Sequence, residues 1–383
     1  MQFISAHKIF DGENYLPFDS VLVYNELNEL LEIVSINSVA KDKINYFDGI
    51  LSPGFVNAHC HLELSHLKDV IKPNTGLVGF AQQIIEKRAL FSEEEMIAHM
   101  LKADEEIWLN GVVAVGDISN NNLSFDVKKK SNIKYHTFIE LIGLNPEVKD
   151  IVFEKGINLM EQLQENGLSG SLAPHAPYSV SGELIKKIAE YNSAKNIPTS
   201  IHNQESEEEN KFFRGEVSDF TKLYQSLNID ISFFKSQSSS SMMSYKNQLG
   251  KSNTILVHNT FTSEEDLNAI IETNFFWCFC PKANNYIENR LPNFNTFTSK
   301  KDKLCLGTDS LASNTCLNIL EEANLLLKES HFELETVLRM LCLNGAKALG
   351  IENCFGKLIP GKATGLNLLN YQDNQLTLIK KIV

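Results

Sequence analysis

The alternation of short apolar runs with longer segments of helical periodicity constrains the fold of this 383-residue chain most strongly. Alternation of this kind predicts βα units and a parallel sheet. Eight such units over roughly 300 residues are what a (β/α)8 barrel requires. The predicted strands are Gly54–His59, Val112–Asp117, Lys134–Leu141, Gly170–Ala173, Pro198–His202, Thr254–His258, Phe275–Cys280 and Lys303–Gly307.

Segments of helical period lie between these strands. Helices are predicted, for example, over Ser92–Asn110, Ser181–Lys195, Thr262–Glu272 and Asn318–Lys328. One low-complexity stretch, Ser236–Ser244, is expected to be a surface loop or the start of a helix.

The two ends of the chain follow a different pattern. Residues 1–51 hold the β-rich stretches Met1–Ile9 and Ser20–Tyr24, with Asp-Gly turn signals, and residues 356–383 return to turns and strands. We therefore expect an α/β protein in two parts. A distorted (β/α)8 TIM barrel would span residues 52–355, and residues 1–51 and 356–383 would together build a small composite β-sandwich domain.

Composition restricts the partners of the chain. It carries 35 basic and 48 acidic residues, a formal net charge of -13. This balance disfavours nucleic acid and anionic membranes, and it fits a neutral or weakly anionic small molecule better than a phosphorylated one. The first residues show no signal-peptide pattern and the chain has no run of 18 apolar residues, so we expect a cytoplasmic protein with reduced thiols.

Polar residues with catalytic potential follow several predicted strands, at the end where a barrel places its active site. His59 and His61 are two positions apart in a strand and therefore point the same way. His202 ends another predicted strand and is followed by Glu205. His258 and Asp309 stand at two further strand ends. Each residue alone is explained as a capping or satisfied polar group, but together they form a nitrogen and oxygen set suited to Zn²⁺ or Fe²⁺.

The motifs resemble those of the amidohydrolase superfamily. The segment Pro53–His61 resembles its opening motif, and His202-x-x-Glu205, His258 and Gly307-Thr308-Asp309-Ser310 match its later motifs in order. More narrowly, the chain is similar to the aminohydrolase branch, which includes guanine, adenosine-type nucleoside and aminofutalosine deaminases and the triazine chlorohydrolases. The similarity spans essentially the whole chain.

The resemblance implies a metal-dependent enzyme with His59, His61, His202 and Asp309 as ligands. Strand four offers no lysine of the kind that dinuclear members carbamylate, and His175 stands there instead, so we expect one divalent ion, Zn²⁺ as first choice with Fe²⁺ as the alternative. Such an ion lowers the pKa of bound water to about 7. Glu205 is then the proton shuttle to the substrate ring, His258 orients the hydroxide, and Asp309 passes its proton to the leaving ammonia.

Three further residues are candidates for substrate binding. Glu63, in His61-Leu62-Glu63-x-Ser65, is either an acceptor for ring N–H or ribose hydroxyl groups or a carboxylate at the rim. Arg88 is either a bidentate partner for a substrate carboxylate or an exposed helix arginine. His175 is expected to line the pocket and contact the base or the sugar.

We therefore expect a hydrolytic deaminase, acting on C–N bonds in cyclic amidines, of a purine nucleoside or nucleobase. The first specific candidate is aminodeoxyfutalosine deaminase of menaquinone biosynthesis. The alternatives are a guanine deaminase, a deaminase of the S-adenosylhomocysteine or adenosine type, and a triazine-type chlorohydrolase. A non-enzymatic scaffold of the superfamily would lack the ligand set that this chain retains. Relatives are commonly dimeric or larger, so a homodimer is a further expectation.

Overall fold

The computed structural model describes residues 1–235, 238–270 and 274–383. Eight parallel strands form its centre, and each lies within two residues of a strand predicted from the sequence. They are β5 (Phe55–Cys60), β6 (Val112–Ser119), β7 (Lys134–Leu141), β8 (Ser169–Pro174), β9 (Thr199–Asn203), β10 (Thr254–His258), β11 (Phe275–Phe279) and β12 (Leu304–Leu306).

The eight strands form two parallel sheets of four, β5-β6-β7-β8 and β9-β10-β11-β12. Backbone hydrogen bonds join the sheets at both seams. On one side the N–H of His202 donates to the carbonyl of His175 at 2.9 Å. On the other, the N–H of Thr308 donates to the carbonyl of His59 at 3.0 Å. The distorted α/β barrel is thus confirmed.

Strand β11 shows why these segments form buried strands. All five of its residues are buried, as expected where both faces of a parallel sheet are covered. Successive side chains point to opposite faces. Phe275, Trp277 and Phe279 belong to the large apolar cluster that includes helix residues, whereas Phe276 and Cys278 belong to a smaller cluster built mainly from strand residues of the barrel interior.

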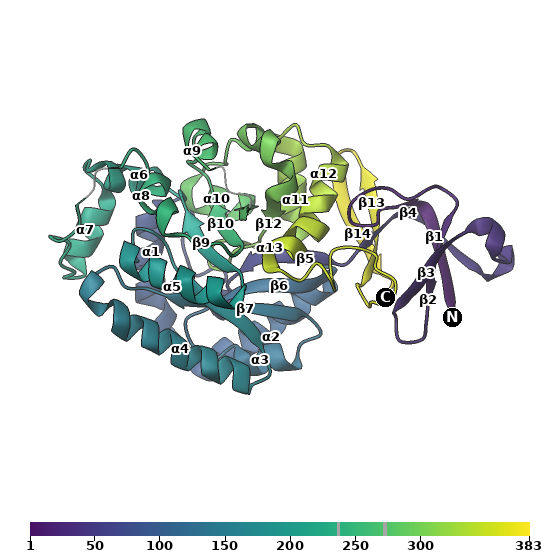
Figure 1. The fold of residues 1–383 in the computed structure, drawn as a ribbon, viewed down its shortest axis with the longest axis horizontal. Coiled ribbons are helices and arrows are strands. Elements are labelled where there is room, and N and C mark those ends of the chain that lie inside the picture. The colour runs from purple at the N-terminus through teal and green to yellow at the C-terminus, as the bar shows by residue number, and fades with distance from the viewer. Residues whose placement is uncertain (236–237, 271–273) are drawn as a thin grey trace.

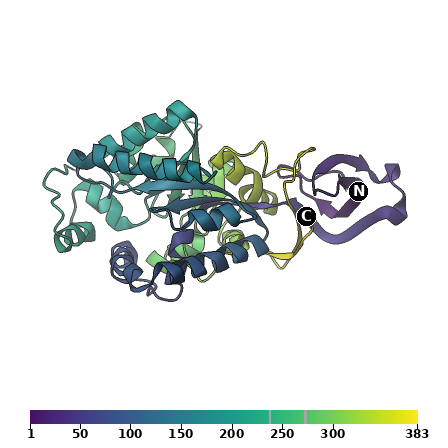
Figure 2. The same ribbon diagram turned by 90° about the horizontal axis from the view of Figure 1, so that it is seen from below.

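Helices surround the barrel (Figures 1 and 2). In α2, the side chain of Ser92 accepts from the backbone of Glu95 and the Glu95 carboxylate accepts from the backbone of Ser92, which is a capping box. Met100, Ala103 and Ile107 recur at helical spacing and form its buried face. The helices are α1 (Gly76–Lys87), α2 (Glu93–Leu109), α3 (Phe125–Lys130), α4 (Lys149–Glu165), α5 (Gly182–Lys195), α6 (Glu207–Arg214), α7 (Asp219–Ser226), α8 (Ser241–Tyr245), α9 (Glu264–Asn268), α10 (Pro281–Glu288), α11 (Ile319–Glu329), α12 (Leu334–Arg339) and α13 (Gly345–Leu349).

Two predicted segments differ from the structure or extend beyond its described part. The described part of the helix predicted over Thr262–Glu272 is helical only in α9, and residues 271–273 lie outside the described residues. Of the stretch Ser236–Ser244, residues 236–237 also lie outside them. Its second half begins helix α8, and Ser241 is fully buried because its hydroxyl binds the carboxylate of Glu209.

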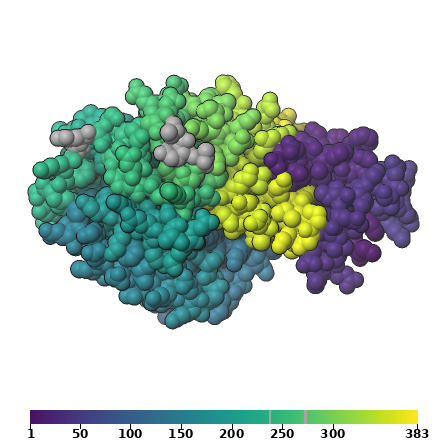
Figure 3. All heavy atoms as spheres, in the orientation of Figure 1, coloured from purple at the N-terminus to yellow at the C-terminus, as the bar shows by residue number. Residues whose placement is uncertain are grey.

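Both ends of the chain join one six-stranded sheet, in the order β14-β13-β4-β1-β2-β3. The expected composite β-sandwich therefore takes the form of a single hydrogen-bonded sheet. The first and last segments of the chain lie side by side next to the barrel (Figures 1 and 3). The strands of the six-stranded sheet are β1 (Gln2–Ile9), β2 (Ser20–Tyr24), β3 (Leu30–Ser35), β4 (Ile44–Pro53), β13 (Leu366–Gln372) and β14 (Gln375–Lys381).

Only Gly54 separates strand β4 from strand β5, so the chain passes directly from the sheet at the chain ends into the barrel. Leu22, Leu51, Leu366 and Leu368 are buried together in the core of the end sheet. The division at residues 51 and 356 into two domains stays a prediction. Within the described residues, no helix has both the length and the apolar composition needed to cross a bilayer.

A buried ion pair fixes the loop that follows β5. The ammonium of Lys128 lies 2.6 Å from Asp117, and both side chains are fully buried. Lys128 also donates to the hydroxyls of Ser119 and Thr137. The other oxygen of Asp117 accepts the N–H of Leu62 at 2.7 Å, directly after the histidine pair.

Replacing Lys128 by Met should destabilise the protein by about 3–5 kcal/mol, because it leaves the Asp117 carboxylate buried and unpaired. The double variant K128M/D117N should recover part of this loss, since a neutral amide still accepts the Leu62 N–H. Chemical denaturation measures both effects. The exposed neighbour Lys129 provides the control K129M, which should stay within about 0.5 kcal/mol of wild type. Equal stability of K128M and K129M would contradict this account.

Candidate active site

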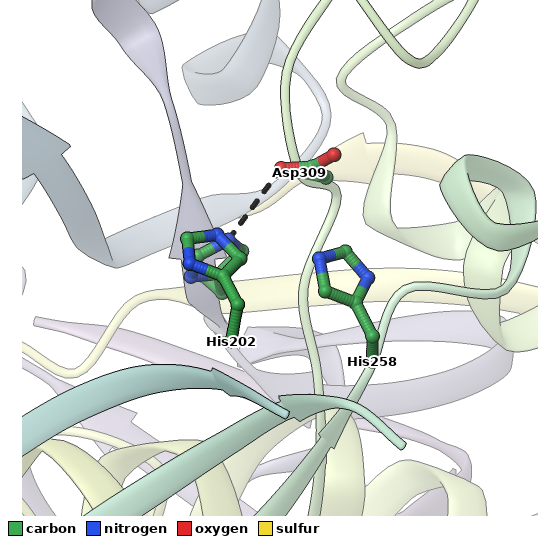
Figure 4. Close-up of side chains that lie close together, drawn as sticks. His202, His258 and Asp309 are labelled. Atoms are coloured by element: carbon green, nitrogen blue, oxygen red, sulfur yellow. Dashed lines mark ion pairs between the residues drawn. The ribbon is translucent and has the colours of Figure 1, made fainter. Parts of the chain in front are cut away.

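Histidine and aspartate side chains from four strands converge at the C-terminal end of the barrel. The Nε2 atom of His61 lies 3.2 Å from Nε2 of His59 and 3.2 Å from Nε2 of His202. The Oδ1 atom of Asp309 lies 3.5 Å from His59 Nε2 and 3.4 Å from His61 Nε2. His258 joins the same group, since one ligand atom each of His59, His202, His258 and Asp309 lies within 4.8 Å of the others. Figure 4 shows His202, His258 and Asp309 facing one another.

Hydrogen bonds at the far side of two rings determine which nitrogen faces the cluster. His202 Nδ1 lies 2.7 Å from the carbonyl oxygen of His175, which only accepts, so Nδ1 carries the proton and Nε2 presents its lone pair. The side-chain amide of Asn284 donates to His258 Nδ1 at 3.0 Å, which leaves the proton of that ring on Nε2. The rings of His202 and His258 are therefore prepared for different tasks.

Backbone conformations at these strand ends are strained. Gln204, His258 and Asp309 have φ values of 46°, 75° and 55°. These values lie in the left-handed region, which residues other than glycine rarely adopt. Such residues cost about 1–3 kcal/mol each and persist where the surrounding structure requires them. Here the strain occurs where β9, β10 and β12 turn sharply, at or beside residues of the cluster.

Burial sets the protonation of the cluster. Burial lowers the pKa of His61 and of His258 to about 3, and it lowers the pKa of His202 well below its ordinary value. Burial alone would raise the pKa of Asp309, but the hydrogen bond with His59 holds it well below its ordinary value. Neutral imidazoles beside an ionised carboxylate are the form in which these groups bind a metal.

Glu205 lies next to the cluster, and its pKa is shifted upward, whereas the pKa values of the cluster residues His61, His202, His258 and Asp309 are shifted downward. Its Oε1 is 3.5 Å from His258 Nε2. Burial, followed by the charge of Asp309, raises the pKa of Glu205 well above its ordinary value. The buried carboxylate of Glu209 accepts the backbone N–H of Gln204 and of Glu205 and thereby fixes this turn.

The cluster forms the floor of a cavity of about 290 Å³. His61, His202, His258, Asp309 and Glu205 line it on the polar side. The opposite walls are apolar and come mainly from α1 and from α7 with the residues that follow it. They comprise Leu77, Phe80, Ile84, Ile85, Phe220, Leu223, Leu227 and Ile229.

The other residues predicted to bind substrate occupy different positions. His175 lines the cavity beside His202, and the half-buried Arg88 lines it at the end of α1. Arg88 has no ion-pair partner among the described residues. Glu63 is buried behind Asn120, whose backbone N–H donates to it at 2.9 Å, and burial raises the pKa of Glu63 to about 7.

Sequence reasoning missed Glu140 and Asn120. It expected the segment Pro281–Ile287 to edge the pocket but gave Asn284 no role at His258. Glu140 and Asn120 line the cavity, and Asn284 lies behind His258. Glu140 follows the same rule that identified the histidines, because it is a charged residue at the C-terminal end of an apolar strand. Asn120 directly follows β6. Asn284 lies on helix α10, and no sequence pattern connects it with His258.

The sequence profile of the Amidohydrolase family matches residues 50–382, and the chain belongs to this family. The expectation drawn from the motifs is thus confirmed. Among curated proteins, the chain is 26% identical over 345 residues to an adenosine deaminase of Helicobacter pylori, covering 86% of this chain and 81% of the relative. It is 25% identical over 382 residues to a 5'-deoxyadenosine deaminase of Methanococcus vannielii, covering 93% and 84%.

Among solved structures, the chain resembles Helicobacter pylori aminofutalosine deaminase in complex with methylthio-coformycin. The TM-score is 0.84 at 24% identity, and the match covers 97% of this chain and 93% of the other. This likeness independently supports the barrel fold.

A buried carboxyl group stabilises the loop that carries Asp309. Glu322 accepts the backbone N–H of Lys282 at 2.8 Å and the side-chain amide of Asn314 at 2.7 Å, and Asn314 in turn donates to the carbonyl of Thr308. Burial raises the pKa of Glu322 from the ordinary value of 4.5 to about 8.

The folded state therefore holds this proton more tightly than the unfolded chain, and Glu322 costs stability as pH rises from about 4.5 through 8. Relative to wild type, E322Q should gain about 4 kcal/mol between pH 5 and pH 9, because the amide does not ionise. Thermal unfolding across this pH range measures the difference. The free-energy cost of any hydrogen bond lost in the variant is the same at both pH values and therefore cancels in the comparison. Parallel curves would refute the prediction. E329Q, at an exposed position of the same helix, is the control.

Proposed function

We propose that the chain is a metal-dependent hydrolytic deaminase of purine nucleosides. One observation carries the proposal. Three histidine Nε2 atoms and an aspartate carboxylate converge at the floor of a cavity, and the buried Glu205 lies 3.5 Å from His258 beside them. The names of the relatives, adenosine and 5'-deoxyadenosine deaminase, support the same reaction.

His59, His61, His202 and Asp309 would hold one divalent ion, Zn²⁺ as first choice and Fe²⁺ as the alternative. The fit rests on the donor set, which consists of three imidazoles and one carboxylate, with a lone pair on His202 Nε2 that faces the cluster. His258 is not among the ligands because Asn284 leaves a proton on its Nε2. When bound, such an ion lowers the pKa of a coordinated water and supplies a nucleophile at neutral pH.

The protein residues would manage the protons. Glu205, whose pKa is raised by burial, would donate a proton to the ring nitrogen beside the amino-bearing carbon. The Nε2–H of His258 would donate a hydrogen bond to the attacking oxygen and orient it. Asp309, held ionised, would take up a proton and pass it to the departing ammonia.

An ammonia-release screen over adenosine, S-adenosylhomocysteine, aminodeoxyfutalosine and guanine tests the reaction. We expect release from the nucleosides and about one metal ion per chain. H202A and D309A should lose metal and reduce turnover by more than about 100-fold, because even residues that only support metal ligands contribute 10- to 100-fold. The exposed His331 gives the control H331A, which should keep both. Full turnover in metal-free H202A would refute the proposal.

Within this class, we propose aminodeoxyfutalosine as the first substrate candidate. It is an adenine nucleoside whose 5' substituent is an aryl ketone with a carboxylate. The apolar walls from α1 and α7 match the aryl group, and Ile85 and Ile142 remain 51% and 55% exposed at the mouth of the cavity. Arg88 lies on the same side with its guanidinium available to a carboxylate.

Replacing Arg88 by Met tests this assignment. The kcat/KM for aminodeoxyfutalosine should fall about 10- to 100-fold, because one charge-assisted contact is lost. The kcat/KM for adenosine should change less than about threefold, and adenosine thus serves as the internal control. An equal loss for both substrates would contradict a role in carboxylate binding.

The alternatives predict different products. A guanine deaminase would release ammonia from guanine and not from nucleosides, and a triazine-type chlorohydrolase would release halide from a chlorinated ring. A non-enzymatic scaffold would release neither. The same screen, extended by a halide assay with a chlorotriazine, distinguishes all of these from a nucleoside deaminase.

A further inference from the structure

Glu140, at the end of β7, is a buried carboxylate of the cavity that the proposed chemistry does not use. The residue is 8% exposed and lines the cavity. One oxygen, Oε2, accepts the side-chain amide of Asn120 at 2.9 Å. The other, Oε1, is buried and has no hydrogen-bond partner among the described residues. An unpaired buried acceptor is costly unless a ligand supplies the donor.

His175 presents a second acceptor beside it. The Ser179 hydroxyl lies 3.1 Å from the carbonyl of Ala176, which only accepts, and 2.6 Å from His175 Nδ1. When the hydroxyl donates to that carbonyl, the ring donates to the hydroxyl from Nδ1. In the neutral ring this leaves Nε2 as an acceptor. One ligand atom each of Glu140, His175 and His202 lies within 4.8 Å of the others, so the side chains of Glu140 and His175 are neighbours in the cavity.

His202 does not complete a second cation site with this pair. The His202 nitrogen that lies 3.7 Å from Glu140 Oε1 is Nδ1, and it carries the proton that is donated to the carbonyl of His175. A protonated nitrogen does not coordinate a metal. Glu140 and His175 are therefore left to face a ligand with two adjacent hydrogen-bond donors.

The chemistry of an adenine nucleoside identifies those donors. The only N–H groups of the adenine base belong to the amino group that leaves, and N3 and N7 are acceptors. The remaining adjacent donors are the 2' and 3' hydroxyls of the sugar. We propose that Glu140 and His175 form the sugar subsite, with Glu140 Oε1 and His175 Nε2 accepting from the vicinal hydroxyls, and that Glu140 determines the preference for ribosides over deoxynucleosides.

Asn120 fixes this subsite and gives Glu63 a role as a positioning residue. The backbone N–H of Asn120 donates to Glu63 and its side chain donates to Glu140, so one residue connects the two carboxylates. Glu63 would thus orient Asn120 and, through it, Glu140. This inference rests on the proposed nucleoside deaminase function.

The test compares kcat/KM for adenosine, 2'-deoxyadenosine and 3'-deoxyadenosine in wild type, E140Q and E140A. Wild type should prefer adenosine over at least one deoxynucleoside by about 10- to 100-fold, the effect of one hydrogen bond to a charged group. E140A should lose activity on adenosine and little on that deoxynucleoside, which removes the preference. E140Q should fall between, because the amide retains only part of the interaction. E190Q, at an exposed position on α5, is the control and should behave as wild type.

Each other outcome overturns the inference. Equal deamination of all three nucleosides by the wild-type enzyme would overturn the inference. This result needs no variant, so it stands even if E140A fails to fold. An equal loss on all three in E140A, or a loss of metal, would show that Glu140 acts through His202. More than one metal ion per wild-type chain, reduced to one in E140Q, would make Glu140 a cation ligand. If no nucleoside releases ammonia, the proposed function is itself wrong and the inference fails with it.

Discussion

The seam between β5 and β12 is the interaction on which the site depends. Asn57 and Thr308 are 251 positions apart and form two hydrogen bonds, from the Asn57 amide to the Thr308 hydroxyl at 2.8 Å and from the Thr308 N–H to Asn57 at 3.1 Å. The carbonyl of His59 accepts the N–H groups of Thr308 and Asp309. A side chain on Gly307 would collide with His59, so the strands approach this closely only with glycine there. The contacts that close the barrel therefore also bring Asp309 next to His59.

Desolvation then gives the cluster its chemistry. A fully exposed histidine would be partly protonated near neutral pH, whereas burial holds His61, His202 and His258 neutral. The same burial raises the pKa of Glu205 well above its ordinary value. Glu63, Glu209 and Glu322 are also buried near the site with raised pKa values, each with backbone N–H donors that partly offset the cost.

The sequence predicted the parts of the site that follow from strand periodicity. Apolar runs determined all eight barrel strands to within two residues, and because parallel strands end at one face, residues such as His59, His202 and Asp309 had to meet there. Glu140 was within reach of the same rule. The apolar walls were not, because Phe80 and Phe220 lie on helices, where a hydrophobic stripe has the pattern of ordinary core packing. The position of Glu63 behind Asn120 depends on the path of the loop after β6, which no local pattern determines.

The location of the metal tests the central claim most directly. Crystals of the protein loaded with Zn²⁺, measured on both sides of the zinc absorption edge, would place the ion by anomalous scattering. We expect one strong site per chain, bounded by the Nε2 atoms of His59, His61 and His202 and the carboxylate of Asp309, with His258 outside the coordination sphere. A site at Glu140 and His175, coordination by His258 in place of His61, or no ordered ion would contradict it.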